Sequence, residues 1–515
     1  MRKAAKISEK QEPLEKQLWS AADKLRKNID AAEYKHVVLG LIFLKCISDS
    51  FEGLFAKLKE GKGEFEGADP EDRDEYKAKN VFFVPKPARW GFLQAKAKKL
   101  EIGQLADGAM DAIEKENPSL KGVLPKVYAR QNLDPASLGG LIDLVANIAL
   151  GDAKSRSADV LGHVFEYFLG EFALAEGKKG GQLYTPRCIV ELLAAMLEPY
   201  QGRVMAPCCG SGGMFVQSEK FVREHQGRLK DLTIFGQESN QTTWRLAKMN
   251  LSIRGLDSSQ VKWNSEGSFL NNTLKDIRAD YLIANPPFND SDWSGDLLRS
   301  DVRWKYGAPP PGNANFAWLQ HFAFHLAPSG QAGIVLAKGA LTSKSSGEGE
   351  IRRRMIEEGN LIDCIVNLPS KLFLNTQIPA ALWFLARDRA NHKFRNRAGE
   401  ILFIDARNMG ELINRRTRVL TPGDIRTISD AYHNWRNPKG LYEDMKGFCA
   451  SVSLSRVKEL DFVLTPGRYV GLPDEEDDFG FAERFTALQK EFAAQLEEGK
   501  RLNDAILESL ARVKI

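Results

Sequence analysis

Residues 203–213 read Arg-Val-Met-Ala-Pro-Cys-Cys-Gly-Ser-Gly-Gly, a short apolar run followed by a glycine-rich turn, directly before a helical segment. Glycines at such a turn let the backbone bend sharply and approach a ligand closely. A strand that ends in a glycine turn and leads into a helix is typical of a nucleotide-binding α/β sheet. The turn alone leaves open a dinucleotide, a phosphate or no ligand at all.

Short apolar runs alternate with helical segments from about Gly180 to Arg387. This alternation predicts an α/β, Rossmann-like fold whose largely parallel sheet is covered by helices on both faces. A further strand is predicted at Ile401–Ile404. The seven strands that we expect in the sheet itself are Arg203–Ala206, Leu232–Gly236, Gln260–Trp263, Tyr281–Ala284, Ala332–Ala337, Asp363–Leu368 and Ala380–Ala386.

The segments before this region read as helical. Leu14–Ile29 and Glu33–Phe51 carry apolar residues at three- and four-residue spacing, and Asp30 between them can cap the second helix. The charged stretch Gly61–Asn80 is predicted to be a surface loop. We therefore expect an N-terminal helical domain over residues 1–155, followed by a catalytic domain over residues 156–472.

The last segment, residues 473–515, begins with the acidic linker Asp474–Asp478 and continues as a long amphipathic helix that can break near Gly499. Its apolar stripe packs either on its own domain or on a partner subunit, and the terminal position favours the partner. The stripe consists of Phe481, Phe485, Leu488, Phe492, Leu496, Leu502, Ile506, Leu510 and Val513.

Composition describes an ordinary globular protein: of 515 residues, 43% are hydrophobic and 27% charged. The net charge of +4 is small, so any nucleic-acid contact should be a local groove or be shared with a partner. Six cysteines without C-x-x-C spacing argue against a disulfide scaffold or a zinc site. The longest apolar run, Val37–Leu44, is far shorter than the roughly 20 residues that span a bilayer. We expect a cytoplasmic protein without a metal or a membrane partner.

A basic patch lies in the N-terminal region. It interleaves four lysines and one arginine with two aromatic residues, which suits either phosphate contact with aromatic support or a solvated helix face over buried aromatics. Both interpretations stay open. The patch consists of Lys86, Arg89, Trp90, Phe92, Lys96, Lys98 and Lys99.

Glu238 ends the next predicted strand, 26 residues beyond Gly212. In a nucleotide-binding α/β sheet, an acid at this position accepts hydrogen bonds from ribose hydroxyls. A carboxylate that merely begins the following helix is the alternative. The glycine turn and Glu238 together favour an adenosine-containing cofactor.

Asn285–Phe288, Asn-Pro-Pro-Phe, follows the apolar strand Tyr281–Ala284. The two prolines stiffen the backbone and remove two N–H donors, which leaves carbonyls as acceptors. The Asn285 side-chain oxygen and the Pro286 carbonyl can both accept from an exocyclic amine and free its lone pair for attack on a methyl group. Phe288 offers a face for one base, which must first flip out of a duplex.

Upstream, Gly181–Arg187 reads Gly-Gln-Leu-Tyr-Thr-Pro-Arg and leads into a predicted helix at Cys188–Leu197. Thr185 before Pro186 is typical of a helix cap with proline in the first turn. Backbone and side chains here could also reach the methionine end of a cofactor.

These motifs in this order resemble the amino-methyltransferases of the gamma arrangement and, more narrowly, the modification subunit of type I restriction-modification systems. The resemblance extends over nearly the whole chain. It includes Leu18–Leu25, Glu33–Gly40, Asn313–Trp318, Asn375–Pro379 and Pro466–Val470. It implies a seven-stranded Rossmann-like, S-adenosyl-L-methionine-dependent methyltransferase domain that methylates N6 of adenine in double-stranded DNA.

The resemblance also implies roles and partners. Two modification subunits would join one specificity subunit that reads the DNA sequence, and a restriction subunit can join them to give a nuclease. The adenine would be held by the catalytic residues Asn285, Pro286, Pro287 and Phe288. The cofactor would be bound by Gln182, Leu183, Tyr184, Thr185, Pro186, Arg187, Gly210, Ser211, Gly212, Gly213 and Glu238.

One position departs from the family pattern. An acidic residue usually precedes the proline of the glycine loop, and this chain has Ala206 there. Its absence would weaken cofactor affinity unless another acid takes over, and Glu266 is a candidate for nearby polar contacts. Two alternatives to DNA adenine methylation stay open: methylation of another planar amine or amide, as in cytosine, RNA or a protein glutamine, and a non-enzymatic DNA-clamping scaffold.

Overall fold

The structure, a computed structural model, describes residues 14–27, 29–147, 157–175, 185–224, 232–373, 379–415, 417–472 and 481–511. By their internal contacts, Met1–Val470 forms one compact unit and Gly471–Ile515 another. The predicted acidic linker Asp474–Asp478 and the cofactor residues Gln182, Leu183 and Tyr184 lie outside the described residues.

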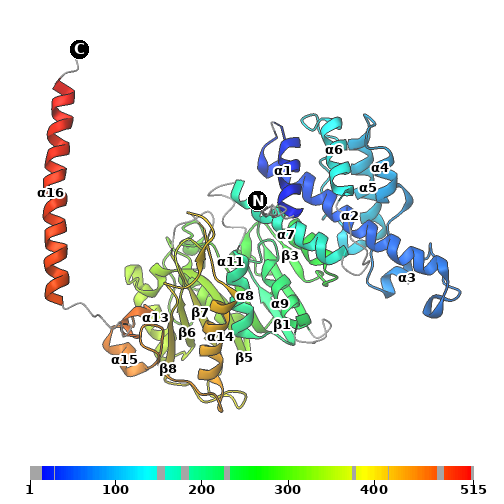
Figure 1. Cartoon of the computed structure of the whole chain (residues 1–515). Helices are drawn as coiled ribbons and strands as arrows, with labels where there is room; N and C mark the ends of the chain where they lie inside the picture. The colour runs from blue at the N-terminus through cyan, green and yellow to red at the C-terminus, as the bar shows by residue number, and fades with distance from the viewer. Residues whose placement is uncertain are drawn as a thin grey trace, which may run out of the picture. The chain divides into compact units, whose positions relative to one another are not determined.

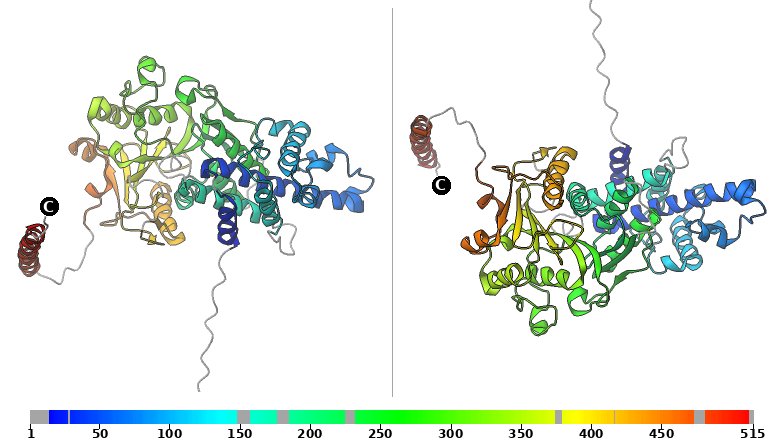
Figure 2. Two further views of the ribbon diagram at one scale, coloured as in Figure 1. Left: turned by 90° about the horizontal axis from the view of Figure 1, so that it is seen from above. Right: turned by 90° about the horizontal axis from the view of Figure 1, so that it is seen from below.

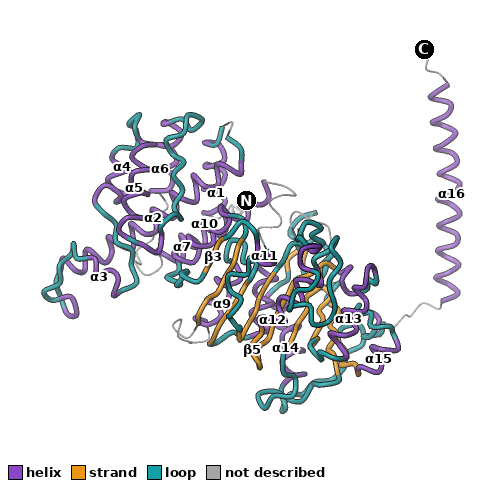
Figure 3. The backbone as a smooth tube through the Cα atoms, turned by 180° about the vertical axis from the view of Figure 1, so that it is seen from behind, coloured by secondary structure: helices purple, strands orange, loops and turns teal. Residues whose placement is uncertain are grey.

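A mixed sheet, whose strands are orange in Figure 3, forms the centre of the first unit. It has nine strands in the order β11-β8-β6-β7-β5-β4-β1-β2-β3. Seven strands point the same way, while β7 and β11 run antiparallel to their neighbours. The strands are β1 Gly202–Ala206, β2 Leu232–Glu238, β3 Val261–Trp263, β4 Ala279–Ala284, β5 Leu326–Ala337, β6 Ile362–Asn367, β7 Ala380–Ala386, β8 Glu400–Asp405 and β11 Cys449–Ser453.

The sheet has nine strands and not the seven expected. All seven predicted strands are present, and the predicted strand at Ile401–Ile404 extends the sheet as β8, parallel to β6. The edge strand β11 was missed because its sequence, Cys-Ala-Ser-Val-Ser, has small and polar residues in place of an apolar run. A short hairpin, β9 Glu411–Leu412 with β10 Arg418–Val419, lies apart from this sheet.

Helices cover both faces of the sheet, as predicted. Alternate residues along each strand enter different hydrophobic clusters: in β4, Tyr281 and Ile283 pack on one side, and Leu282 and Ala284 on the other. One face carries α8 Arg187–Leu197, α9 Gly213–Glu224, α10 Gln241–Ile253 and α14 Pro422–Arg436. The other carries α11 Gly267–Leu270, α12 Asn315–His325, α13 Glu348–Glu357 and α15 Leu454–Glu459.

The N-terminal helices gather around the long helix α2 beside the β3 end of the sheet (Figures 1 and 2). Their apolar core continues into α10 through Leu246, Met249 and Ile253. Asp30 caps α2 as predicted, accepting from the Ala32 amide at 2.7 Å. The helices are α1 Leu14–Leu25, α2 Ala31–Glu60, α3 Arg73–Ala78, α4 Trp90–Ala95, α5 Ile102–Glu116, α6 Pro135–Ala146 and α7 Ser157–Ala175.

One sequence prediction in this region needs correction, and the structure also bears on the basic patch, for which two interpretations were open. The stretch Gly61–Asn80 is not only a loop, since it contains α3, whose Tyr76 is buried and stacks on Phe51 at 4.6 Å. In the basic patch, Trp90 is buried in the core and Arg89 bonds Glu71 and lies over the Phe51 ring. Of the two interpretations of the basic patch, these contacts fit a helix face over buried aromatics.

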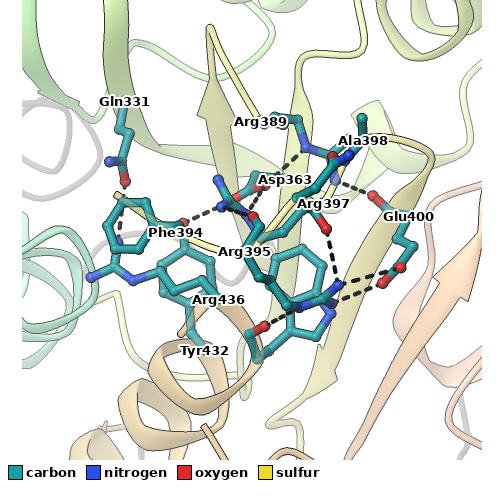
Figure 4. A network of polar contacts seen from close by, with 12 residues as sticks. Gln331, Asp363, Arg389, Phe394, Arg395, Arg397, Ala398, Glu400, Tyr432 and Arg436 are labelled. Carbon is teal, nitrogen blue, oxygen red and sulfur yellow. Dashed lines mark hydrogen bonds and ion pairs between the residues drawn. The ribbon is translucent and has the colours of Figure 1, made fainter. Parts of the chain in front are cut away.

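At the amino ends of β6 and β8, a buried polar network ties the sheet to α14 (Figure 4). Asp363 Oδ1 accepts from Arg389 Nε at 2.9 Å and from Arg397 Nε at 3.0 Å. Its other oxygen accepts from the Tyr432 hydroxyl at 2.8 Å. The last residue of α14, Arg436, donates to Gln331 in β5. This network fixes the edge of the sheet opposite the candidate site.

The second unit contains α16 Phe481–Ala511, a single helix of 31 residues that does not break at Gly499. One glycine in a run of helix-forming residues costs only about 1 kcal/mol, which explains the continuity. Its apolar side chains Leu488, Phe492 and Leu496 are exposed within this unit. Within the described residues, none of the helices combines the length and apolar character needed to cross a membrane.

Candidate functional site

The carboxyl ends of β1, β2 and β4 bring three predicted site segments together. These neighbouring strands are parallel, so Pro207–Gly213 after β1, Glu238 at the end of β2 and Asn285 after β4 meet at one edge. A cavity of about 480 Å³ lies there and is lined by parts of all three segments, with Thr185 and Arg187. The three motifs, which lie far apart in the sequence, therefore form one site in the fold.

The glycine loop adopts the sharp turn that its sequence predicts. Gly210 and Gly212 have φ angles of +55° and +80°, and residues other than glycine rarely adopt φ angles in this region. The Cys209 amide donates to the Gln237 carbonyl of β2 at 3.0 Å, which ties the loop to the neighbouring strand. Helix α9 begins directly at Gly213, so the first turn of the helix faces the cavity.

Glu238 is bound to this loop. Its carboxylate accepts from the Gly210 amide at 3.0 Å and from the Asn240 amide at 2.9 Å. Burial raises the pKa of the Glu238 carboxyl above its usual range, against the lowering effect of these hydrogen bonds. Asn240, and not Glu238, caps the following helix α10. Both carboxylate oxygens of Glu238 thus accept a backbone N–H, and the residue lines the cavity.

Ala206, where the family pattern has an acid, is buried in the hydrophobic cluster beneath the loop. The loop amide of Gly210 nevertheless has a carboxylate partner in Glu238. Glu266 also lines the cavity and accepts from the Asn271 side chain at 2.8 Å. Acidic groups are thus present around the loop although position 206 carries none.

The side chain of Asn285 has one polar atom in a hydrogen bond and the other without a donor among the described residues. Its Nδ2 donates to the hydroxyl of Thr185 at 3.0 Å. Its Oδ1 is buried and has no donor among the residues that the structure describes. A buried carbonyl oxygen without a donor is costly, so the site presents an acceptor for a group that arrives with a ligand.

The sequence predicted that Thr185 caps α8, and this prediction is wrong. The residue before this helix is Pro186, without a side-chain cap, and the helix begins at Arg187. The Thr185 hydroxyl instead accepts from Asn285, 100 residues further along the chain. Sequence proximity favoured the cap, while the fold brings Thr185 to the end of β4.

Phe288 lies beside the cavity and not in its lining. Its ring meets Phe373 edge-to-face, with centroids 5.8 Å apart and planes inclined by 74°. Phe373 was not predicted as a site residue, although it precedes the quoted motif Asn375–Pro379 by two positions. Pro286 is buried, and Pro287 lines the cavity with Asn285.

The segment after Phe288 is clamped onto the start of α12. Asn289 has a φ of +54°, and its amide donates to Asn315 Oδ1 at 3.1 Å. Asn315 Nδ2 donates back to Asn289 Oδ1 at 2.8 Å, and the Ala314 amide donates to the Asp290 carbonyl. The motif Asn313–Trp318 therefore holds the backbone that follows Asn-Pro-Pro-Phe.

Several site residues could not be found from local sequence, because they come from distant helices. Asn250 of α10 donates to the Ser211 carbonyl at 2.9 Å, and Arg254 bonds both Asn250 and Glu166 of α7. Phe269 lines the cavity beside Trp318. Asn250, Arg254, Glu166 and Phe269 stand in no recognisable motif, and their spacing along the chain carries no signal.

The cavity is acidic. Five carboxylates line it, and Arg187 is the cation among its described lining residues, where it bonds Glu191 on its own helix. Such a site favours a cationic ligand over a phosphate, which excess negative charge would repel. The five carboxylates are Glu166, Glu238, Glu266, Asp290 and Asp292.

Comparison with known proteins gives consistent matches. The family model described as N-6 DNA Methylase matches residues 156–478, and the one described as HsdM N-terminal domain matches residues 14–145. The chain is 46% identical over 440 residues to the type I restriction enzyme HindI methylase subunit of Haemophilus influenzae, covering 81% of this chain and 97% of that protein. It is 38% identical to the MjaIX methylase subunit of Methanocaldococcus jannaschii, covering 96% and 90%.

Among solved structures, the chain is similar to a type I restriction-modification methyltransferase subunit from Streptococcus thermophilus. The TM-score is 0.75 at 24% identity, and the match covers 89% of this chain and 99% of that one. At this identity the likeness supports the fold.

Proposed function

Since this chain belongs to the N-6 DNA methylase family, as a methylase subunit of a type I restriction-modification system, we propose that Asn285 holds the N6 amine of a flipped-out adenine beside S-adenosyl-L-methionine in the acidic cavity. The enzyme is an S-adenosylmethionine-dependent, adenine-specific DNA methyltransferase. The observation that supports the proposal is the buried Asn285 Oδ1, which is oriented by Thr185 and lacks a donor among the described residues.

The residues of the cavity fit S-adenosyl-L-methionine. The cofactor carries a positive sulfonium and a positive amine, which suit a cavity whose described lining residues include five carboxylates and one arginine. Glu238 at the end of β2 would accept from the ribose hydroxyls. Gly210, Ser211, Gly212 and Gly213 would bring backbone close to it, and the segment Gln182–Arg187 would lie at its methionine end. The bound cofactor supplies an electrophilic methyl group.

Asn285 and Pro286 would activate the amine by accepting its hydrogens. Asn285 Oδ1 takes one N–H and the Pro286 carbonyl takes the other, which draws the nitrogen lone pair out of conjugation with the ring. As the new N–C bond forms, the bond between the methyl group and the cofactor's sulfur would break and leave its electron pair on sulfur as a neutral thioether. Positive charge would develop on the nitrogen, and these fixed acceptors would stabilise it. The surplus proton then leaves the amine for water.

An adenine inside a duplex could not reach a buried oxygen, so the target nucleotide must flip out. Phe288 and its edge-to-face partner Phe373 would form an aromatic wall for the extruded base. Asn289 and Asn315 bond each other and so hold the backbone that follows Phe288. The aromatic wall and the two acceptor oxygens would therefore keep their positions relative to each other.

We extend the proposal to assembly. Double-stranded DNA is the substrate in the cytoplasm, and a specificity subunit supplies the sequence choice, with two methylase subunits to one specificity subunit. The exposed stripe Leu488, Phe492 and Leu496 of α16 would dock on that partner, and residues 1–155 would contact DNA or the assembly. A restriction subunit joins when the complex acts as a nuclease, and methylation protects host DNA.

The test is methyl transfer from labelled S-adenosyl-L-methionine to unmethylated DNA, with and without the specificity subunit, followed by nucleoside analysis. We expect label on N6 of adenine, and only when the partner is present. Label on cytosine, RNA or a protein glutamine would assign a different acceptor. Absence of label from a folded, assembled complex would support the scaffold alternative.

A further inference from the structure

Polar side chains continue along the carboxyl edge of the sheet beyond Asn285. Strands β5, β6 and β8 point the same way as β4. Lys338 follows β5, Asn367 ends β6 and Asp405 ends β8. Neighbouring strands lie about 4.8 Å apart, so in the order β4-β5-β7-β6-β8 this row extends from about 5 to about 19 Å from β4.

A buried carboxylate positions an exposed arginine in this row. Asp405 accepts from Arg407 through Nε at 2.9 Å and Nη2 at 2.7 Å, and from Asn367 Nδ2 at 3.1 Å. The Asp405 side chain is 4% exposed, whereas that of Arg407 is 56% exposed. The guanidinium is therefore held from its inner side and keeps its outer N–H groups available.

The motif Pro466–Val470, whose role the sequence left open, packs onto this pair. A Cβ added to Gly467 would lie 2.8 Å from Arg407 Nη2 and 3.1 Å from Asp405 Oδ2, so only glycine fits without displacing them. Tyr469 stacks on Phe403 of β8 with centroids 4.0 Å apart. The motif thereby holds its backbone against the Asp405–Arg407 pair, and the exposed Arg468 is the residue that follows Gly467 in this segment.

Lys338 adds a third cation. Its amine is half-buried at the end of β5, one strand from Asn285, and bonds none of the acceptors that the structure describes. Burial lowers the pKa of Lys338, while Asp405 raises it and Arg407 lowers it, so the three groups lie within electrostatic reach of one another. Among the described residues, Lys338 and Arg407 thus share the carboxylate of Asp405, and Arg468 lies in the segment that packs on this pair.

The sign of charge therefore changes along one edge of the sheet. The cavity at the carboxyl ends of β1, β2 and β4 is acidic, whereas the described residues Lys338, Arg407 and Arg468 make the continuation over β5 to β8 basic. An acidic cavity accepts a cationic cofactor and repels phosphate, whereas the basic half attracts a polyanion. The basic half of the edge spans about 15 Å. At about 3.4 Å of helix axis per phosphate of one strand, this length corresponds to about four nucleotides.

We propose that Lys338, Arg407 and Arg468 bind the sugar–phosphate backbone of the DNA strand being methylated, on the side of the target adenine that passes over β5 to β8. This inference rests on the proposed function of Asn285. Guanidinium groups bind phosphate oxygens through two parallel N–H donors, and Asp405 pre-organises Arg407 for such a contact. The motif Pro466–Val470 then acts in DNA binding by positioning Arg468.

The test uses the full chain assembled with its specificity subunit. The rate of methyl transfer to unmethylated DNA fragments is measured against DNA and salt concentration for wild type, Arg468→Gln and Lys338→Gln. Each variant should raise KM for DNA by about 5- to 10-fold near physiological salt and reduce the slope of log(1/KM) against log salt by about 0.9 per lost phosphate contact. The kcat and the affinity for S-adenosyl-L-methionine should not change, and Arg468→Lys should recover most of the DNA affinity.

Lys439→Gln is the matched control, because it removes the same charge at the opposite edge. Lys439 is exposed and follows α14, whose last residue Arg436 bonds Gln331. If the wild type is active and both Arg468→Gln and Lys338→Gln leave KM and the salt slope unchanged, this inference is overturned, while the proposed function stands. An equal effect of Lys439→Gln would overturn it as well. An inactive wild-type complex would instead refute the proposed function.

Discussion

The side-chain amide of Asn285 donates to the hydroxyl of Thr185 at 3.0 Å, which leaves the Asn285 carbonyl oxygen buried and without a donor among the described residues. A hydroxyl can accept an N–H, so this contact selects which end of the amide faces the cavity. Thr185 is thus a positioning residue for the group that would bind the adenine amine.

Replacing Thr185 by valine should therefore lower kcat. The substitution preserves shape but removes the acceptor, so the amide of Asn285 can turn over. We expect a loss of about 3- to 10-fold, the range of one hydrogen bond. Thr185→Ser keeps a hydroxyl and should remain near wild type in kcat. Steady-state methyl transfer on DNA, with cofactor affinity measured by calorimetry, separates orientation from cofactor contact. Equal activity of the valine and serine variants would show that the hydroxyl has no such role.

Removing the acceptor itself should have a larger effect. Asn285→Ala deletes the oxygen that would stabilise charge on the reacting nitrogen, and loss of one preorganised group of this kind costs about 100- to 1,000-fold in kcat. Assembly and cofactor affinity should stay unchanged, because Asn285 bonds Thr185 and makes no bond to the glycine loop. Single-turnover methyl transfer with gel filtration of the complex measures both, and undiminished transfer would refute the assigned role.

Glu238 should govern cofactor affinity. Glu238→Gln replaces one acceptor oxygen by an amide nitrogen, so one of the bonds from Gly210 and Asn240 is lost along with the charge. Since hydrogen bonds to a charged group contribute about 1.5–3 kcal/mol, we expect cofactor affinity to fall by about 10- to 100-fold.

The pH dependence of this affinity follows from the raised pKa of Glu238. Protonation turns one oxygen into a donor, so the affinity should decline as pH falls and should do so at a higher pH than for an ordinary carboxyl. Titration calorimetry between neutral and mildly acidic pH measures this, with Glu224→Gln on the exposed end of α9 as the control. A wild-type affinity that stays constant with pH, or equal affinities of the two variants, would contradict the assignment.

Local sequence predicted the strands and the glycine turn because each depends on a few adjacent residues. Apolar runs such as Tyr281–Ala284 reach the centre of the sheet, and the glycines of the loop take the positive φ angles that their type permits. The motif Asn285–Phe288 also predicted that Asn285 serves as an acceptor, but not what orients its side chain.

The remaining features depend on contacts across the chain. The bond from Asn285 to Thr185 and the bond from Arg254 to Glu166 each join residues more than 80 positions apart. The strand β11 forms because an edge position tolerates small residues, and the acidic character of the cavity arises only when α7, β2 and the loop after β4 converge. Nothing in the local pattern encodes such convergence.

The buried network at the opposite edge should determine stability and not cofactor binding. Asp363 is fully buried, and burial opposes its ionisation, but Arg389 and Arg397 outweigh this effect and hold its pKa below the usual range. A carboxyl with a lowered pKa in the folded state stabilises the fold above its unfolded pKa, and that stability is lost as pH falls through the folded value.

Asp363→Asn should therefore reduce the free energy of unfolding by about 3–5 kcal/mol, because it leaves two buried guanidinium groups without a counter-charge. Thermal unfolding at neutral pH measures the shift, and the difference from wild type should narrow as the pH falls. Glu459→Gln, which breaks the exposed pair with Arg456, is the control and should cost less than about 1 kcal/mol. Since Asp363 lies at the amino end of β6, cofactor affinity below the unfolding temperature should equal that of wild type. Equal stabilities of the two variants would mean that Arg389 and Arg397 are held by their backbone contacts and not by Asp363.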